Sequence, residues 1–293
     1  MRANFSKKAV SATVILIIIV AGILAFVIYK NSEKVIPVPV ETKIAFPQKS
    51  VIGLSVQGRE IEAYTYGKGD TQLAFVGGIH GGYEWNSVLL AYKFMDYLEA
   101  NPAIIPKNIS VIVIPSLNPD GVSKVVGKDG RFTVTDVPNN IELTKVGRFN
   151  MDEVDLNRNF DCRWQATSTW QSKKVSAGTS AFSEPEAKAF QDFVLKNNLS
   201  AVVFWHSQSN GVYASVCNNG ILPGTLDLMN TYSIASGYPA QKSFDSYTIT
   251  GAADDWLASI NIPAVSVELK THESIEWDKN LAGILALFKY YTK

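Results

Sequence analysis

Five apolar, β-branched runs constrain the fold more than any other feature of this 293-residue chain. They are IEAYTY (61–66), QLAFVGGI (72–79), ISVIVIP (109–115), AVVFWH (201–206) and PAVSVEL (263–269). Their apolar residues follow one another instead of alternating with polar ones, which is typical of strands that are buried on both faces of a sheet. We therefore expect a sheet that is covered on both sides.

Helical patterns separate these runs. Apolar residues recur at helical spacing from Glu84 to Ala100, and further patterns cover roughly 223–237 and 276–291. The segment SEPEAKAFQDFVLKNN (183–198) predicts a helix with Ser183 as its N-cap and Glu186 completing a capping box. Strands that alternate with helices predict an α/β domain, a mixed twisted sheet flanked by helices on both faces.

The N-terminal segment predicts one transmembrane helix. Residues 9–29 form a run of 21 uncharged, mostly apolar residues after a basic segment, residues 1–8. This length spans a hydrocarbon core of about 30 Å, whereas the apolar region of a cleavable signal peptide has about 7 to 15 residues. We expect residues 1–8 to be cytoplasmic and 9–29 to be a signal anchor, although Lys30 and Lys34 weaken the charge bias.

The remaining chain then divides into a linker and one domain. Residues 30–48 contain three prolines and no helical period, which is typical of an extended linker. Residues 49–293 are expected to form a single extracytoplasmic domain. Cys162 and Cys217 either pair in such an exported domain or remain two buried free thiols. The formal net charge of zero gives no indication of a nucleic-acid partner.

Three polar residues stand at the predicted carboxyl ends of strands: His80, His206 and Glu268. Ligands of open α/β sheets bind at that edge, so we expect these side chains to lie close together. Glu84 follows His80 by four residues, and two histidines with one glutamate are a known catalytic zinc set. Taken alone, the pair of His80 and Glu84 is equally consistent with a turn histidine followed by a glutamate at a helix start.

Several motifs occur in a fixed order along the chain. They are GGIHGGYEWN (77–86), SLNPDGV (116–122), GRFNMDEVDLNRNFD (147–161), WHSQSNGVY (205–213), DSYTITGAADDW (245–256) and VSVEL (265–269). Together they resemble the zinc metallocarboxypeptidase family, which contains the pancreatic carboxypeptidases and the bacterial murein-peptide amidases. The resemblance covers about residues 50–290, and VDLNRNF is its most specific element.

The resemblance implies a metal site and the groups around it. His80, Glu84 and His206 resemble the ligands of one zinc ion per chain, and Glu268 resembles the general base. Arg148 matches the arginine that helps to stabilise the oxyanion, and it is preferred here over Arg131, which lies in a glycine-flanked turn.

The resemblance also implies how substrate is held. Asn157 and Arg158 match the pair that binds a free C-terminal carboxylate, and Tyr247 matches the mobile tyrosine that closes over the substrate. Asp254 stands where the family has the floor of its specificity pocket, so we expect basic or diaminopimelate side chains to be accepted. Alternatively, Asp254 is a solvated acid at a helix start. His272 is expected to be a surface histidine in a polar loop, and contact with the substrate is the alternative.

One departure concerns the first two ligands, which the family usually spaces as H-x-x-E and this chain as H-x-x-x-E. Positions three and four apart share a helix face, and the second glycine leaves the turn free to accommodate the extra residue. The expected function is that of a membrane-anchored zinc metallocarboxypeptidase acting on peptides or on peptidoglycan stem peptides. A catalytically inactive module that binds peptide C-termini is the alternative, and a deacylase of the same fold fits less well.

Overall fold

The structure is a computed structural model, and it describes residues 18–24, 26, 27, 30 and 47–292. The chain forms two compact units, residues 1–44 and 45–293. In the first unit the described residues are helical and exposed. No helix in the described part of the chain has both the length and the hydropathy needed to cross a membrane. Much of the predicted span 9–29, and nearly all of the predicted linker, lies outside the described residues.

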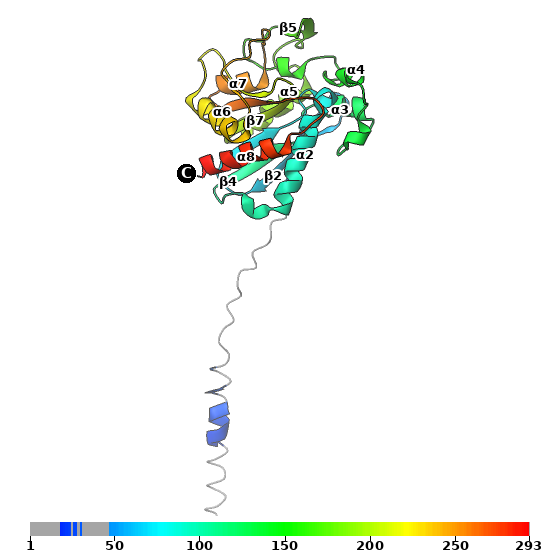
Figure 1. The fold of residues 1–293 in the computed structure, drawn as a ribbon. Helices are drawn as coiled ribbons and strands as arrows, with labels where there is room; N and C mark the ends of the chain where they lie inside the picture. Colours follow the sequence, from blue (N-terminus) through cyan, green and yellow to red (C-terminus); the bar gives the residue numbers. More distant parts are fainter. Residues whose placement is uncertain (1–17, 25, 28–29, 31–46, 293) are drawn as a thin grey trace, which may run out of the picture. The chain divides into compact units, whose positions relative to one another are not determined.

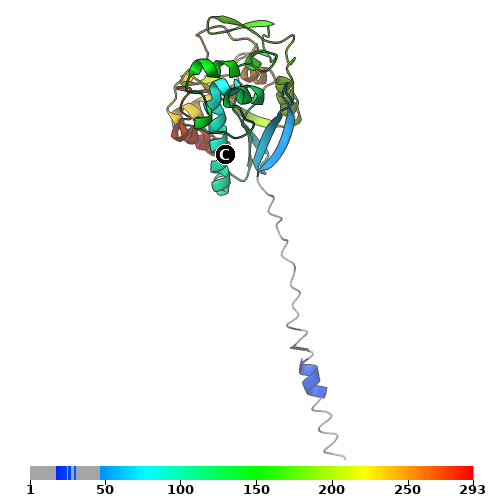
Figure 2. The same ribbon diagram turned by 90° about the vertical axis from the view of Figure 1, so that its right-hand side faces the viewer.

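An eight-stranded mixed sheet forms the centre of the second unit (Figure 1). Its strands lie in the order β1 (Gln48–Leu54), β2 (Glu60–Gly67), β4 (Ile109–Ile114), β3 (Thr71–Val76), β7 (Leu199–Ser207), β10 (Ala264–Leu269), β8 (Gly211–Ala214) and β9 (Ala240–Gln241). The four central strands, β4, β3, β7 and β10, are mutually parallel, whereas β1, β2 and β8 each run antiparallel to a neighbour. Figure 2 shows the β1–β2 hairpin in blue at one edge of the sheet.

Helices cover both faces of this sheet, as the sequence predicts. Helices α2 (Trp85–Ala100), α6 (Pro223–Ser236) and α8 (Trp277–Tyr291) pack on one face, and α5 (Pro185–Lys196) and α7 (Ala253–Ser259) pack on the other. Phe75 belongs to the first core and its neighbour Val76 to the second. Successive residues of the central strands are therefore both buried in apolar surroundings, which explains why the strands read as continuous apolar runs.

Short elements complete the second unit. They are η1 (Gly81–Glu84), η2 (Pro102–Ile104), α3 (Pro119–Val126), η3 (Val134–Asp136), α4 (Ile141–Thr144), η4 (Lys145–Gly147), η5 (Leu156–Arg158) and a separate hairpin of β5 (Thr167–Trp170) and β6 (Lys173–Ser176). The sequence patterns do not predict this hairpin, whose strands have only four residues each.

The predicted capping box at the start of α5 is wrong. The helix begins at Pro185 with Glu184 as its N-cap, and no side-chain hydrogen bond caps it. The Ser183 hydroxyl instead donates to Glu184 Oε1 at 2.7 Å and accepts from Asn159 Nδ2 at 3.0 Å. Ser183 is therefore engaged by the preceding loop and is not available to the helix.

The two cysteines form a disulfide between Cys162 and Cys217, with their Cα atoms 6.0 Å apart. This finding decides between the two states that the sequence leaves open. The bond joins the segment that follows η5 to the segment that follows β8, across 55 residues of sequence. These two segments border the cleft described below.

Candidate active site

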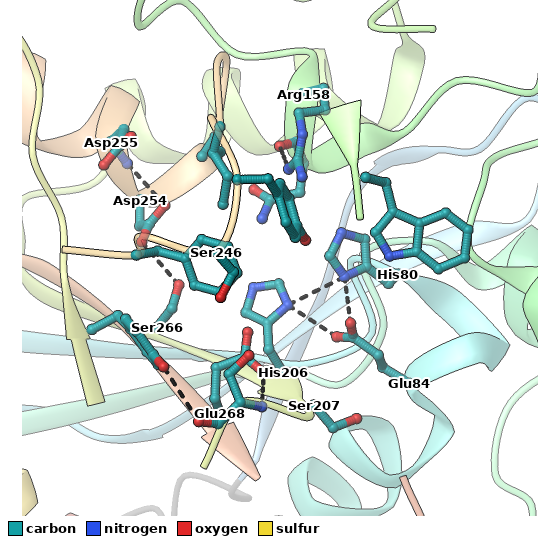
Figure 3. A pocket seen from close by; sticks show the side chains of 18 of the residues that line it. His80, Glu84, Arg158, His206, Ser207, Ser246, Asp254, Asp255, Ser266 and Glu268 are labelled. Atoms are coloured by element: carbon teal, nitrogen blue, oxygen red, sulfur yellow. Dashed lines mark hydrogen bonds and ion pairs between the residues drawn. The ribbon is translucent and has the colours of Figure 1, made fainter. Parts of the chain in front are cut away.

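The carboxyl ends of three parallel strands bring the predicted polar residues together. His80 follows β3, His206 lies near the end of β7, and Glu268 lies near the end of β10. Glu268 is the register partner of His206 in the parallel pairing of β10 with β7. Figure 3 shows these side chains around one cavity.

His80, Glu84 and His206 form a buried cluster. The two Glu84 carboxylate oxygens lie 2.7 Å from His80 Nδ1 and 2.9 Å from His206 Nδ1. The two Nδ1 atoms lie 3.3 Å apart, and one ligand atom from each of the three residues lies within 4.8 Å of the other two. Four-residue spacing thus lets Glu84 face both imidazoles.

The turn between the first two ligands explains how the additional residue is accommodated. Gly81 to Glu84 form a single 3₁₀ turn, and Gly81 has a left-handed backbone with φ of +47°. Gly81 therefore supplies the backbone freedom of the turn, whereas the sequence suggests that Gly82 does so. A Cβ atom on Gly81 would collide with the carbonyl oxygen of Gly147 and lie 2.9 Å from the backbone of Gly121. The turn therefore packs directly against two other backbone segments.

Asp155, which the motif VDLNRNF contains but which was not among the predicted site residues, lies behind the cluster. Its Oδ1 lies 3.4 Å from His80 Nε2, which makes no hydrogen bond within the described residues. Its Oδ2 accepts from Arg148 Nε at 3.1 Å and from Arg148 Nη2 at 2.8 Å. A carboxylate behind a histidine orients its ring and selects its tautomer, an arrangement that is common behind metal-binding histidines.

The cluster is strongly polarised. Burial opposes the ionisation of Glu84, but the imidazoles of His80 and His206 overcome this and hold its pKa well below the usual range. Burial likewise opposes the ionisation of Asp155, yet Arg148 and Arg158 keep the pKa of its carboxyl low. Both carboxylates are therefore anionic at neutral pH.

These residues fit a zinc ion by their chemistry and by their arrangement. Zinc in catalytic sites is held by three protein ligands, and two histidines with one glutamate are such a set. The three side chains are buried, and their ligand atoms already converge on one point. The close approach of two imidazole nitrogens to one carboxylate is what a shared cation would stabilise.

Glu268 faces the cavity beside this cluster. Its Oε2 accepts a hydrogen bond from the backbone N–H of Ser209 at 3.1 Å. Burial raises the pKa of Glu268 to about 7; His206 opposes the change, and Glu84 adds to it. A carboxyl with this pKa exchanges protons readily near neutral pH, as general acid–base catalysis requires.

Arg148 is buried at the cavity, and the rival Arg131 lies elsewhere. The Arg148 guanidinium lies 4.5 Å from the ring centroid of Trp170, and its Nη1 is 3.7 Å from Glu84. Arg131 instead pairs with Asp96 at 2.8 Å and does not line the cavity. The hairpin strand β5, which contributes Trp170, thus holds the guanidinium of Arg148 near the predicted metal ligands.

Asn157 and Arg158 line the same cavity and are held by backbone groups. Arg158 donates from Nη1 to the Asn157 carbonyl at 2.7 Å and from Nε and Nη2 to the Thr169 carbonyl at 3.2 and 3.0 Å. Asn157 Oδ1 accepts from the Ala253 N–H at 2.9 Å. Arg158 therefore keeps part of its donor set for a ligand such as a carboxylate.

Tyr247 and His272 both line the cavity. The half-buried Tyr247 ring packs against Phe244, with 4.9 Å between the ring centroids. The prediction that His272 lies on the surface is wrong: it is 6% exposed, and its Nδ1 lies 2.8 Å from Ser207 Oγ. Its ring also packs against Tyr83 at 4.5 Å. A loop that reads as polar in sequence folds back over the strand ends.

Asp254 lies in the cavity wall, where Figure 3 shows it beside Asp255 and Ser266, away from His80 and Glu84. Its Oδ2 accepts from the Ser266 hydroxyl at 2.8 Å. Arg163, which belongs to none of the motifs in the sequence, also lines the cavity and pairs with Asp255 at 3.0 Å. The cavity, of about 500 Å³, therefore has the predicted metal ligands at one part and a group of charged side chains at another.

Comparisons with known proteins identify the family and the fold of the chain. The family model described as zinc carboxypeptidase matches residues 43–282. Carboxypeptidase B of Helicoverpa zea is 27% identical over an alignment of 211 positions, which covers 64% of this chain and 47% of that protein. Carboxypeptidase B of Astacus astacus is 29% identical over an alignment of 226 positions, which covers 70% of this chain and 72% of that protein. The chain thus spans about half the length of the first relative and most of the second.

A solved structure shares the fold. Murein-tripeptide amidase MpaA from Escherichia coli O157 superposes with a TM-score of 0.61 at 20% sequence identity, covering 84% of this chain and 93% of that one. At this level of identity the likeness establishes the α/β fold.

Proposed function

The chain belongs to the zinc carboxypeptidase family of peptide hydrolases, and we propose that it removes C-terminal residues from peptides that end in a free carboxylate. The observation that carries this proposal is the position of Arg158. A buried guanidinium with free donors lines the same cavity as the His80, Glu84 and His206 cluster. A peptide whose carboxylate pairs with Arg158 would place its last peptide bond toward that cluster.

Glu268 is the proposed general base. His80, His206 and Glu84 would hold a zinc ion, which would supply Lewis-acid chemistry at the scissile carbonyl and at the attacking water. Glu268 accepts a proton from the attacking water and then delivers it to the nitrogen of the leaving amino acid. Its Ser209 hydrogen bond occupies Oε2, so the other oxygen remains for proton transfer.

Arg148 is proposed to stabilise the oxyanion. Asp155 holds it through Nε and Nη2, which leaves Nη1 directed toward the cluster, 3.7 Å from Glu84. A donor that is fixed before the reaction begins stabilises developing negative charge without reorganising during the reaction.

Asn157 and Arg158 are proposed to bind the terminal carboxylate, and Tyr247 to close over the bound residue. Three N–H groups of Arg158 are engaged by two backbone carbonyls, so the orientation of the guanidinium is set before substrate arrives. Tyr247 is half-buried and lies in a mostly exposed segment that lines the cavity, which suits a side chain that moves on binding.

Asp254 is proposed to select the side chain of the departing residue. A carboxylate that lines a cavity is costly to desolvate unless a cation joins it. We therefore propose that the enzyme prefers lysine, arginine or the amine-bearing end of diaminopimelate, including such residues in peptidoglycan stem peptides.

We further propose that residues 9–29 anchor the chain in the cell membrane with the catalytic unit outside. The uncharged run and its basic flank support this orientation. The Cys162–Cys217 disulfide supports an oxidising environment for the catalytic unit. Membrane fractionation, followed by protease treatment of intact cells, tests both statements. Recovery in the soluble fraction, or protection of the catalytic unit from protease, would contradict the anchor or the orientation.

A panel of peptides tests the activity. Peptides with free and amidated C-termini are incubated with purified protein, with chelator, and with chelator followed by zinc. We expect hydrolysis of the free-carboxylate peptides only, its loss with chelator and its return with zinc. Binding of these peptides without hydrolysis in the zinc-loaded protein would favour the inactive module instead.

A further inference from the structure

Three charged side chains line the part of the cavity that lies away from the metal-ligand cluster: Asp254, Asp255 and Arg163. Both aspartates lie in the first turn of α7. Arg163 follows Cys162, whose disulfide partner Cys217 follows Val216, so the segments of Arg163 and Val216 are joined covalently. This group is thus attached to a cross-linked part of the fold.

Asp255 is used within the protein. It is 9% exposed; its Oδ1 accepts from the Val216 N–H at 2.8 Å and its Oδ2 from Arg163 Nη2 at 3.0 Å. Both oxygens therefore have a partner, and one of these partners is a cation. Burial and the neighbouring Asp254 nevertheless raise the pKa of Asp255 to about 7.

Asp254, unlike Asp255, has no cationic partner within the described residues. Its Oδ1 accepts from the backbone N–H of Asp255 at 3.0 Å and its Oδ2 from the Ser266 hydroxyl at 2.8 Å, and both donors are neutral. Across residues 47–292, no Lys, Arg or His side chain forms an ion pair with Asp254. This carboxylate is therefore open to a ligand cation.

Arg163 presents the opposite charge in the same cavity, where it pairs with Asp255. Both of its hydrogen bonds come from one nitrogen, Nη2, which donates to the Val216 carbonyl and to Asp255, each at 3.0 Å. Within the described part of the chain, Nε and Nη1 have no hydrogen-bond partner, and the side chain is 46% exposed. Of the five N–H donors of a guanidinium, three thus remain for a ligand anion.

We propose that this pocket recognises a C-terminal residue whose side chain ends in both an ammonium and a carboxylate, as in a 2,6-diamino diacid such as diaminopimelate. Asp254 takes the ammonium and Arg163 takes the carboxylate. Arg163 is then a specificity-determining residue, and it separates this substrate from lysine, which has the ammonium alone. The inference rests on the proposed carboxypeptidase activity and narrows its substrate class.

Two peptides that differ only in their last residue, diaminopimelate or lysine, test the proposal. We measure kcat/KM for both with the parent protein and with Arg163→Gln. We expect the parent to favour the diaminopimelate peptide by about tenfold, the scale of one charge-assisted hydrogen bond. In Arg163→Gln this preference should disappear, because the diaminopimelate rate falls far more than the lysine rate.

Arg131→Gln is the matched control, since Arg131 is an exposed arginine that pairs with an aspartate away from the cavity. It should leave the preference unchanged. A parent with equal rates on the two peptides would overturn the inference, as would an Arg163→Gln variant that lowers both rates equally. The second result would mean that Arg163 only supports Asp255.

Calorimetric binding of the same two peptides separates the inference from the activity on which it rests. The binding preference does not depend on turnover. A parent that binds the diaminopimelate peptide more tightly but cleaves neither peptide would contradict the proposed function and support the pocket. A parent that cleaves both peptides without preference would support the proposed function and contradict the proposed pocket.

Discussion

Glu268 and His206 are direct neighbours across two parallel strands, so that the proposed base and a proposed metal ligand share one register position. Both residues lie within strands. The same strand pairing runs through five further residues of β10, all matched one to one with β7. The distance between the two groups is therefore set by the sheet itself, the most rigid part of the domain.

Mutations should distinguish the roles of the two glutamates, Glu84 and Glu268. Glu84→Ala removes one of three metal ligands and should lower zinc content and activity together. Glu268→Gln should retain zinc and lower kcat by about 10²- to 10⁴-fold, the range expected for a proton-transfer group. Zinc content by mass spectrometry and kcat are measured on the same preparations. If Glu84→Ala bound zinc as well as the parent, the proposed ligand set would be wrong.

The activity should depend on pH through Glu268. Burial raises the pKa of its carboxyl to about 7 in the metal-free protein, and a bound divalent cation would lower it. The base acts when ionised, so kcat/KM should rise with pH and level off at or below about pH 7. The pH profile of kcat/KM on an uncharged-side-chain peptide checks this. If kcat/KM fell as the pH rose toward 7, a group other than Glu268 would control the pH dependence.

The proposed binding of the substrate carboxylate by Asn157 and Arg158 predicts two losses of activity of similar size. Arg158→Ala should reduce kcat/KM on free-carboxylate peptides by about 10- to 150-fold, equivalent to about 1.5–3 kcal/mol for a charge-assisted hydrogen bond. C-terminal amidation should cost the parent a similar factor, and it should cost the variant much less. Because amidation changes the substrate and not the protein, it controls for any misfolding of the variant. Equal parent rates on both peptides would indicate an endopeptidase or amidase.

The side-chain pocket predicts a change of preference in Asp254→Ala. This variant should lose at least about tenfold in kcat/KM on C-terminal lysine or arginine peptides, since the charge partner of the substrate is gone. Peptides ending in leucine or phenylalanine should be spared or improved. The ratio of the two rates is the measurement, and an unchanged ratio would mean that Asp254 does not contact the departing residue.

The glycine turn makes a prediction about stability. Gly81→Ala combines a left-handed backbone with collisions against backbone atoms and should lower the free energy of unfolding by about 1–3 kcal/mol or more. Gly127→Ala is its control, because Gly127 is also left-handed, with φ of +73°, but has open space around its Cβ position. Thermal unfolding of both variants should show the larger shift for Gly81→Ala. Equal shifts in the unfolding temperature would mean that the close packing at Gly81 does not contribute to the loss of stability.

Several elements were predictable because their signals are local. The continuous apolar runs identify the central strands, and the residues that end them, His80, His206 and Glu268, follow directly. The resemblance adds Arg148, which the structure places in the cavity, whereas Arg131 lies outside it. The family and its zinc chemistry, first seen as a resemblance, are confirmed by the match over residues 43–282.

Other features depend on contacts that no local pattern contains. Arg163 lines the cavity because of its pairing with Asp255, 92 residues away, and His272 is buried because its loop returns to Ser207. Ser183 has the residue type of a helix cap but is engaged by Asn159. In each case a distant partner, not the neighbouring sequence, decides where the side chain lies.

The contact of Gly81 with the backbones of Gly121 and Gly147 has a consequence for how this site can diverge. Three segments meet there without any side chain between them, so none of them can adjust to a change in another by choosing a different rotamer. A relative with a larger residue at any of the three positions would have to reroute its ligand turn. The inserted residue and the glycines should therefore be inherited as one unit, and a search for proteins that carry all of them would define the subgroup to which this chain belongs.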